Sequence, residues 1–349
     1  MKIKHFVWLR AHTAKYNLSS SGVKPIPLGD VVKLGEAGNF IEDLMNVYGV
    51  DKRNLVVTHG TQEGNFAALT ALRELGKVEH VITVIPEYEP IRVLPRFLHL
   101  RQTEIVINES LTELFNYIKK NSVLFFSNPN NPLGIFLSKK LLWELSDELR
   151  RKDAYAVIDS IFLEFVESNL RDLPMENMIF TFSTSKFYTM SELKVGWVVG
   201  DESVVKEING IVDLVSPLVI DLNLKYVSIL IQNRKWVRER NLGIIMPNVE
   251  IMRKIIKEAG DYVNISYVQY MPILYMRLRC RGVTGSYFSN KLLSKDVLTV
   301  PGQYFGKDDG IRIGLGSVLR NDFEIAMRII MESINEECAG LHDPTDADS

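Results

Sequence analysis

The sequence predicts an α/β protein: a seven-stranded, mostly parallel sheet sandwiched by helices, with a smaller α+β domain. Three observations predict this fold class. Seven short runs rich in β-branched and aromatic residues are apolar throughout, amphipathic stretches of helical length separate several of them, and this alternation stops after Gly200. Strands that are apolar on both faces and alternate with helices are typical of a parallel sheet covered on both sides.

The strands of the large sheet are expected at residues 55–58, 78–85, 104–107, 123–127, 155–159, 178–182 and 195–199. Between them, the apolar periodicity predicts helices at 63–75, 111–120 and 139–151. Ser138 is the expected N-cap of the last of these helices.

After Gly200 the pattern predicts a different arrangement. Residues 221–240 are expected to form one long helix, and another helix is expected beyond Gly243. A pair of strands within 263–279 and a closing helix at 323–337 complete the smaller α+β domain. The final acidic, apolar-poor residues are predicted to form a frayed tail.

Composition limits the class of protein. The chain has 349 residues, 46% hydrophobic and 24% charged, which is ordinary for a soluble globular protein of more than one core. The net charge of −2 gives no general attraction to nucleic acid or to an anionic membrane. Neither a signal peptide nor a membrane span is recognisable, so we expect a cytoplasmic location. Cys280 and Cys338 match no zinc or redox spacing and are expected to be reduced thiols.

Polar clusters marked by glycine or proline follow the expected strands. They lie at 60–63, 86–88, 128–134, Asp159 and 183–186. In open α/β sheets, ligands bind in the loops beyond the carboxyl ends of the strands. The sequence therefore predicts a functional site at this edge of the sheet.

Lys186 comes directly after the strand 178–182, beside Ser183 and Ser185. A lysine in this position is poorly placed for a solvated surface charge. It suits an amine that condenses with an aldehyde, which calls for partial burial and a lowered pKa. The alternative is a lysine at a strand end that only hydrogen-bonds the loop.

Asp159 ends an apolar strand and is followed by Ile161 and Phe162. A carboxylate in apolar surroundings needs a cationic or strongly donating partner. A protonated pyridine nitrogen is one such partner. The alternative is an aspartate that only caps a helix or a turn.

Three further positions suit ligand binding. Asn131 lies in the loop 128–134, where its side chain can donate to a phenolic oxygen. The segment 60–64 joins a strand to a helix and resembles a phosphate cradle, although many strand–helix turns look similar. Arg312 can clamp a carboxylate in bidentate fashion, or it is a surface residue of a strand.

Several strings occur together in a fixed order: Gly60-Thr-Gln62, Pro86-Glu-Tyr88, Asn128-Pro-Asn-Asn-Pro-Leu-Gly134, Asp159-Ser-Ile-Phe162, and Ser183-Thr-Ser-Lys186 followed by Lys194-Val-Gly196. Their order and spacing resemble aminotransferase classes I and II, the fold type I pyridoxal phosphate (PLP) enzymes, from about Gly38 to Arg312. Within that superfamily the chain is similar to the histidinol-phosphate aminotransferase and threonine-phosphate decarboxylase group.

The resemblance implies PLP as the cofactor and a role for each residue that would contact its ring. Lys186 would hold the cofactor as a Schiff base and then move the α-proton of the substrate. Asp159 would pair with the pyridine nitrogen. Asn131 would donate to the phenolic oxygen and border the substrate, and Tyr88 would stack on the ring.

The resemblance also implies how phosphate and substrate are held. The backbone at Thr61 and Gln62, with Ser183 and Lys194, would bind the cofactor's phosphate. Arg312 would bind the α-carboxylate of the substrate. The implied domains are an N-terminal arm with part of the small domain (1–35), a large PLP-binding domain ending in an interdomain helix (36–240), a small domain (241–339) and a flexible tail (340–349).

Three positions depart from the family pattern. Phe162 stands where a tyrosine is usual, and Lys194 stands where an arginine is common. Lys33-Leu34 stands near the place of a tyrosine that a neighbouring subunit contributes to the phosphate. Family members are homodimers, and we expect a homodimer here, in which Lys33 reaches the partner's phosphate.

The expected reaction moves an amino group from an amino acid to a 2-oxo acid. The alternatives are a PLP-dependent decarboxylase or lyase on the same scaffold, since fold alone does not choose the reaction, and a non-catalytic binding module. A Rossmann dehydrogenase is disfavoured because no Gly-x-Gly-x-x-Gly follows the first strand.

Overall fold

The protein is described by a computed structural model that covers residues 2–108, 110–258 and 262–339. The chain divides into two compact units. The first contains Pro25–Asn131 and Ile135–Arg240, and the second contains Lys2–Lys24, Pro132–Gly134 and the chain from Asn241 onward. The predicted tail, 340–349, lies outside the described residues.

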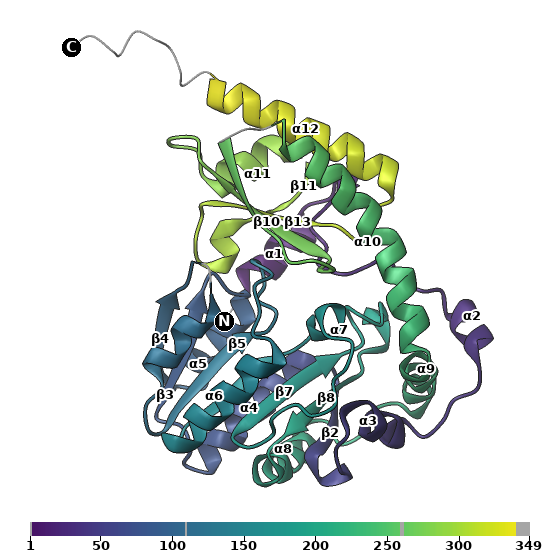
Figure 1. Cartoon of the computed structure of the whole chain (residues 1–349), viewed down its shortest axis with the longest axis vertical. Helices are drawn as coiled ribbons and strands as arrows, with labels where there is room; N and C mark the ends of the chain where they lie inside the picture. The colour runs from purple at the N-terminus through teal and green to yellow at the C-terminus, as the bar shows by residue number, and fades with distance from the viewer. Residues whose placement is uncertain (1, 109, 259–261, 340–349) are drawn as a thin grey trace. The chain divides into compact units, whose positions relative to one another are not determined.

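The first unit is built on a large sheet (Figure 1). Its strands are β2 (Leu55–Thr58), β3 (His80–Ile85), β4 (Arg101–Val106), β5 (Ser122–Ser127), β6 (Tyr155–Asp159), β7 (Met178–Ser183) and β8 (Gly196–Gly200). Within the described residues they form one seven-stranded sheet in the order β2-β8-β7-β6-β5-β3-β4. Among these seven strands β8 runs opposite to the other six, so its pairs with β2 and β7 are antiparallel and the remaining pairs are parallel. The predicted fold class is confirmed, and each expected strand forms with small shifts at its ends.

The first unit also contains helices, several of which pack on the sheet. They are α2 (Leu28–Val31), α3 (Phe40–Tyr48), α4 (Thr61–Glu74), α5 (Glu89–Phe97), α6 (Lys139–Arg151), α7 (Leu163–Val166), α8 (Glu202–Val215) and α9 (Asp221–Gln232), with short 3-10 helices η1 (Val32–Leu34), η2 (Lys52–Asn54), η3 (Leu111–Tyr117) and η4 (Ser191–Leu193). Apolar side chains of α4, α5 and α8 share one buried cluster with the strands. The expected N-cap of α6 is confirmed, because Ser138 Oγ accepts from the Leu141 N–H at 3.5 Å.

Two helix predictions were wrong in detail. The stretch expected as a helix at 111–120 is a 3-10 helix, η3, which an amphipathic pattern alone does not distinguish from an α-helix. The helix expected at 221–240 breaks at Asn233, whose side chain donates to the Ile229 carbonyl at 2.8 Å. A new helix, α10 (Arg234–Ile256), then runs through Gly243, where a fresh start was expected.

The second unit is a smaller α+β arrangement. Its four-stranded antiparallel sheet has the order β12-β13-β10-β9, from Val300–Pro301, Gly310–Gly314, Ile273–Leu278 and Val263–Ser266. A separate short pair joins β1 (Tyr16–Asn17) to β11 (Val297–Leu298). The unit also has α1 (Lys4–Ala11), α11 (Gly285–Ser294), η6 (Gly302–Phe305) and α12 (Arg320–Ala339). The predicted strand pair and closing helix are both present.

The two cysteines form a disulfide, so the expectation of reduced thiols was wrong. Cys280 follows β10, and Cys338 lies in the last turn of α12. Their Cα atoms are 5.3 Å apart, within the usual range for a disulfide. The two residues are 58 positions apart in sequence, a separation that does not reveal that the end of β10 and the end of α12 meet.

None of the helices in the described part of the chain is both long and apolar enough to cross a membrane.

Candidate active site

Asp159 closes the fully buried strand β6 and is only 3% exposed. Its Oδ1 accepts from the Ile161 N–H at 3.2 Å, and its Oδ2 accepts from Asn65 Nδ2 at 2.9 Å. The side chain of Thr61 also hydrogen-bonds to it. Burial raises the pKa of Asp159 to about 6, and these hydrogen bonds and the charge of Lys186 oppose the rise. The structure thus brings Thr61 and Lys186, two residues that the sequence predicted for the site, close to the buried carboxylate of Asp159.

The start of α4 lies against this carboxylate because the helix packs closely on the sheet. A Cβ added to Gly64 would lie 3.2 Å from a methyl carbon of Thr181, on β7. Thr181 is the register partner of Asp159 across the neighbouring strands. Its hydroxyl donates to Asn65 Oδ1 at 2.7 Å, so one polar chain links α4, β7 and β6.

Backbone at the N-terminus of α4 forms a cradle. Gly60 caps the helix with φ 98°, a conformation that glycine adopts without strain. A Cβ on Gly196 would lie 2.5 Å from the Cα of Gly60, and a Cβ on Gly60 would lie 3.6 Å from Ser183 Oγ. First-turn N–H groups of a helix have no intrahelical partner, and the helix dipole adds positive potential there. The cradle therefore suits a phosphate.

Lys186 is half-buried in the loop after β7. Ser183 Oγ accepts from the Ser185 N–H at 3.2 Å and contacts Ser185 Oγ at 3.0 Å. The hydroxyl of Ser191 donates to the Ser185 carbonyl at 3.2 Å. These bonds fix the backbone on the N-terminal side of Lys186.

A buried ionic cluster fixes the loop on the other side of Lys186. Glu164, on α7, is 2% exposed and accepts from Tyr188 Oη at 2.7 Å and from Arg234 Nε at 3.0 Å through the same oxygen. Burial raises the pKa of Glu164, and the charge of Arg234 opposes the rise. The cluster therefore ties Tyr188, two residues after Lys186, to the helix that follows the Asp159 motif.

The loop that carries Asn131 is held by a second buried carboxylate. Glu87 is fully buried and accepts from Ser127 Oγ at 2.6 Å, the Tyr88 N–H at 2.7 Å and Asn130 Nδ2 at 3.2 Å. Ser127 Oγ in turn accepts from the Asn131 N–H at 2.9 Å. Burial raises the pKa of Glu87 to about 7. Glu87 thus fixes the backbone of both Tyr88 and Asn131.

Two more predicted residues meet at the edge of this region. The side-chain amide of Gln62 donates to Tyr88 Oη at 3.1 Å.

Phe162, which stands in the usual place of a tyrosine, is 1% exposed and packs against Phe165 with ring centroids 6.4 Å apart.

Lys194 and Lys33 lie on the surface of the first unit, and Arg312 lies in the second unit. Lys194 is exposed, and its backbone has the left-handed conformation with φ 52°. Lys33 is exposed and pairs with Asp30 at 2.8 Å. Arg312 belongs to the second unit, where it is 2% exposed and its Nη2 donates to the Ser19 carbonyl at 2.6 Å.

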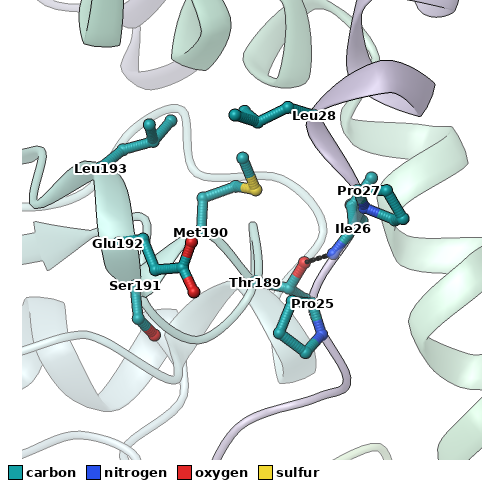
Figure 2. A pocket seen from close by; sticks show the side chains of 9 residues that line it. All are labelled: Pro25, Ile26, Pro27, Leu28, Thr189, Met190, Ser191, Glu192 and Leu193. Atoms are coloured by element: carbon teal, nitrogen blue, oxygen red, sulfur yellow. Dashed lines mark hydrogen bonds between the residues drawn. The ribbon is translucent and has the colours of Figure 1, made fainter.

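A pocket of about 370 Å³ lies beside the loop that follows Lys186. Its walls come from Pro25–Leu28 and from the segment 189–193. Figure 2 shows the side chains of Leu28, Met190 and Leu193 around the same space, and the Ile26 N–H donates to Thr189 Oγ1 at 3.1 Å. The pocket is thus mainly apolar and built within the first unit.

Comparison with known proteins defines the class. The sequence model of the family described as aminotransferase class I and II matches residues 35–330. This match covers most of the chain, and the chain belongs to that family. The protein is accordingly a PLP-dependent aminotransferase, with the fold type I architecture that the sequence predicted.

Two curated relatives cover most of the sequence. An aspartate aminotransferase of Pyrococcus horikoshii is 25% identical over 92% of this chain and 84% of its own length. A histidinol-phosphate aminotransferase of Carboxydothermus hydrogenoformans is 24% identical over 82% of this chain and 79% of its own length.

Solved structures support the fold. A PLP-dependent aminotransferase from Streptococcus suis superposes with a TM-score of 0.83 at 20% identity, covering 97% of this chain and 98% of that one. The PLP-dependent cyclase OrfR gives a TM-score of 0.82 at 18% identity, covering 98% of each chain. At these identities the likeness concerns the fold.

Proposed function

We propose that the active site of this aminotransferase is the cluster around Lys186 and Asp159 in the first unit. The observation that carries the proposal is the buried Asp159 carboxylate. It interacts electrostatically with Lys186 and is hydrogen-bonded by Asn65 near the start of α4. An ionised carboxylate at 3% exposure is costly to bury unless a cation pairs with it. A protonated pyridine nitrogen meets that need, and the glycine-lined helix N-terminus beside it suits a phosphate. The residues present therefore fit PLP.

When bound, PLP supplies an aldehyde for the amino group and an electron-withdrawing ring. In our assignment Lys186 Nζ holds the aldehyde covalently and moves the α-proton once it is released. Asp159 keeps the ring nitrogen protonated. Asn131 donates to the phenolic oxygen and borders the substrate, and Tyr88 stacks on the ring.

The remaining assignments concern the phosphate and the substrate. The backbone N–H groups of Thr61 and Gln62 and the hydroxyl of Ser183 bind the phosphate, with Lys194 adding charge. A lysine there keeps the positive charge but lacks the planar fork of an arginine. Arg312 binds the α-carboxylate of the amino acid through its bidentate guanidinium.

The test is a panel of amino donors given to the PLP-loaded protein. One donor alone should change the cofactor's absorbance spectrum, and adding 2-oxoglutarate should restore it, because transamination occurs in two reversible halves. Aspartate and histidinol phosphate belong in the panel, since they appear in the names of two relatives.

For a donor that is an α-amino acid, such as aspartate, the matched control is the corresponding amine without the α-carboxylate. It should react poorly, since Arg312 then has nothing to bind. Release of carbon dioxide or ammonia, with no need for a 2-oxo acid, would instead favour the decarboxylase or lyase alternative.

A homodimer is also part of the proposal. The end of α8, the start of α9 and the chain between them expose an apolar segment, here called the 214–222 segment. Its large apolar side chains are 58–85% exposed: Leu214, Val215, Leu218, Ile220 and Leu222. Contiguous apolar surface of this kind marks an interface. A second copy is the occupant we propose, because closed two-fold symmetry is the commonest way for a soluble protein to cover such a patch.

Replacing both Leu214 and Leu218 with lysine should convert the dimer to a monomer in sedimentation, since two buried charges in an interface are costly. Phe97→Lys is the control, because Phe97 is 52% exposed at the end of α5 and lies outside the segment. An active monomeric wild type would contradict the dimer and, with it, the role of Lys33 at a partner's phosphate. The cytoplasmic location expected from the sequence is likewise a proposal, and the disulfide is unusual for that compartment.

A further inference from the structure

Asn65 lies outside the motifs that resemble the family, yet it touches the central carboxylate. It is on the second turn of α4 and is 3% exposed. Its Nδ2 donates to Asp159 Oδ2 at 2.9 Å, and its Oδ1 accepts from Thr181 Oγ1 at 2.7 Å. Both polar ends of the amide are therefore used inside the protein.

The Asp159 carboxylate fixes which end of the Asn65 amide faces it, because an ionised carboxylate only accepts hydrogen bonds. If the amide were flipped, its oxygen would face the carboxylate, and two acceptors would repel each other. In the orientation present, donation runs from Thr181 to Asn65 to Asp159, and hydrogen bonds in such a chain strengthen one another.

Several groups act on the ionisation of Asp159. Lys186 is the cation that favours the charged form, and the charge of Asp159 in turn raises the pKa of Glu87. Asn65, Thr61 and the Ile161 N–H are neutral donors to the carboxylate. The hydrogen bond from Asn65 lowers the pKa that burial raises, and it is the contact that holds Oδ2 of the carboxylate.

We propose that Asn65 is a positioning residue, whose side-chain amide holds the Asp159 carboxylate ionised and turned toward the ring nitrogen of PLP. The inference rests on the proposed role of Asp159. It adds a residue that sets the pH range in which Asp159 can act.

The main test replaces Asn65 with leucine, which is of similar size but donates nothing. Losing a hydrogen bond to a buried charge should raise the titration midpoint of Asp159 by about one to two pH units. Carboxyl carbon NMR of the cofactor-free protein, with the Asp159 signal assigned from Asp159→Asn, measures this directly. PLP affinity should fall by about tenfold or more at pH 6.5, and by less at pH 8.5, where the carboxylate ionises even without Asn65.

Two variants make the result specific. Thr70→Val is the matched control on α4, because the Thr70 hydroxyl donates to the Phe66 carbonyl at 2.7 Å. It should leave the Asp159 midpoint unchanged. Thr181→Val keeps Asn65 but removes the hydroxyl that donates to its amide oxygen, so it should raise the midpoint by a smaller amount. It also serves if Asn65→Leu fails to fold.

The proposal is overturned if neither Asn65→Leu nor Thr181→Val moves the Asp159 midpoint, or if the loss of PLP affinity is the same at both pH values. A uniform loss would mean that Asn65 only supports the packing of α4. The role of Asp159 fails separately, if Asp159→Asn binds PLP and turns over substrate like the wild type while Asn65→Leu still shifts the midpoint.

Discussion

Replacing Lys186 with alanine should reduce transamination by about four to six orders of magnitude, the range seen when a covalent catalyst is removed. The amine would be lost both as the covalent anchor and as the group that moves the α-proton. Steady-state turnover with the best donor measures the loss. Borohydride reduction of the wild type, followed by peptide mapping, should place the pyridoxyl adduct on Lys186.

Lys194→Ala is the matched control, because Lys194 is exposed and lies eight residues further along the same loop region. It should keep the adduct on Lys186 and lose only part of its affinity for the cofactor. An adduct on a different lysine, or none in PLP-loaded protein, would defeat the assignment of Lys186.

Asp159→Ala should lower turnover by several orders of magnitude, on the order of a thousandfold or more, while the protein remains folded. Without the carboxylate, nothing at the end of β6 keeps the ring nitrogen protonated, so the ring withdraws electrons poorly. Turnover measured beside a circular dichroism spectrum separates this effect from unfolding.

Asp201→Asn provides the comparison. Asp201 also follows a strand, β8, but its carboxylate caps α8 by accepting from the Ser203 N–H at 3.0 Å. Its replacement should leave turnover close to that of the wild type. Near-normal activity in Asp159→Ala would show that Asp159, like Asp201, is merely structural.

The large sheet could be predicted because its strands, such as β6 and β7, are short, apolar throughout and bounded by polar residues. The ends of the helices were harder to predict from the sequence. The break at Asn233 depends on a side chain that bonds the Ile229 carbonyl, and the apolar periodicity continues past it. Likewise, Gly243 has open space around it, so the helix passes through without a steric reason to stop.

The site was predictable where residues follow strands directly, as Lys186 and Asp159 do. The residues that hold them in place were not. Asn65 lies 94 positions from Asp159, and Arg234 lies 70 positions from Glu164, so their pairing exists only in the folded chain. Glu87 lies in the polar cluster 86–88, which the sequence predicted to be part of the site. Its position directly after an apolar strand was the sequence feature that could have indicated a buried carboxylate.

The two buried carboxyls at this site have a thermodynamic consequence for the protein without its cofactor. Folding raises the pKa of Asp159 from 3.8 to about 6 and that of Glu87 from 4.5 to about 7. For a carboxyl group whose pKa is higher in the folded than in the unfolded protein, the contribution to stability is fully present below the pKa of the unfolded state. It is lost as the pH rises through the pKa of the folded state. At neutral pH the cofactor-free protein is therefore less stable than at pH 4 as far as these two groups are concerned. A ligand that binds the folded protein and pairs with Asp159 restores part of this lost stability by mass action. The free energy of unfolding should therefore increase as the protein is loaded with cofactor. A neutral replacement at Asp159 escapes this penalty, but alanine there also leaves the buried donors Asn65 Nδ2 and Ile161 N–H without their acceptor.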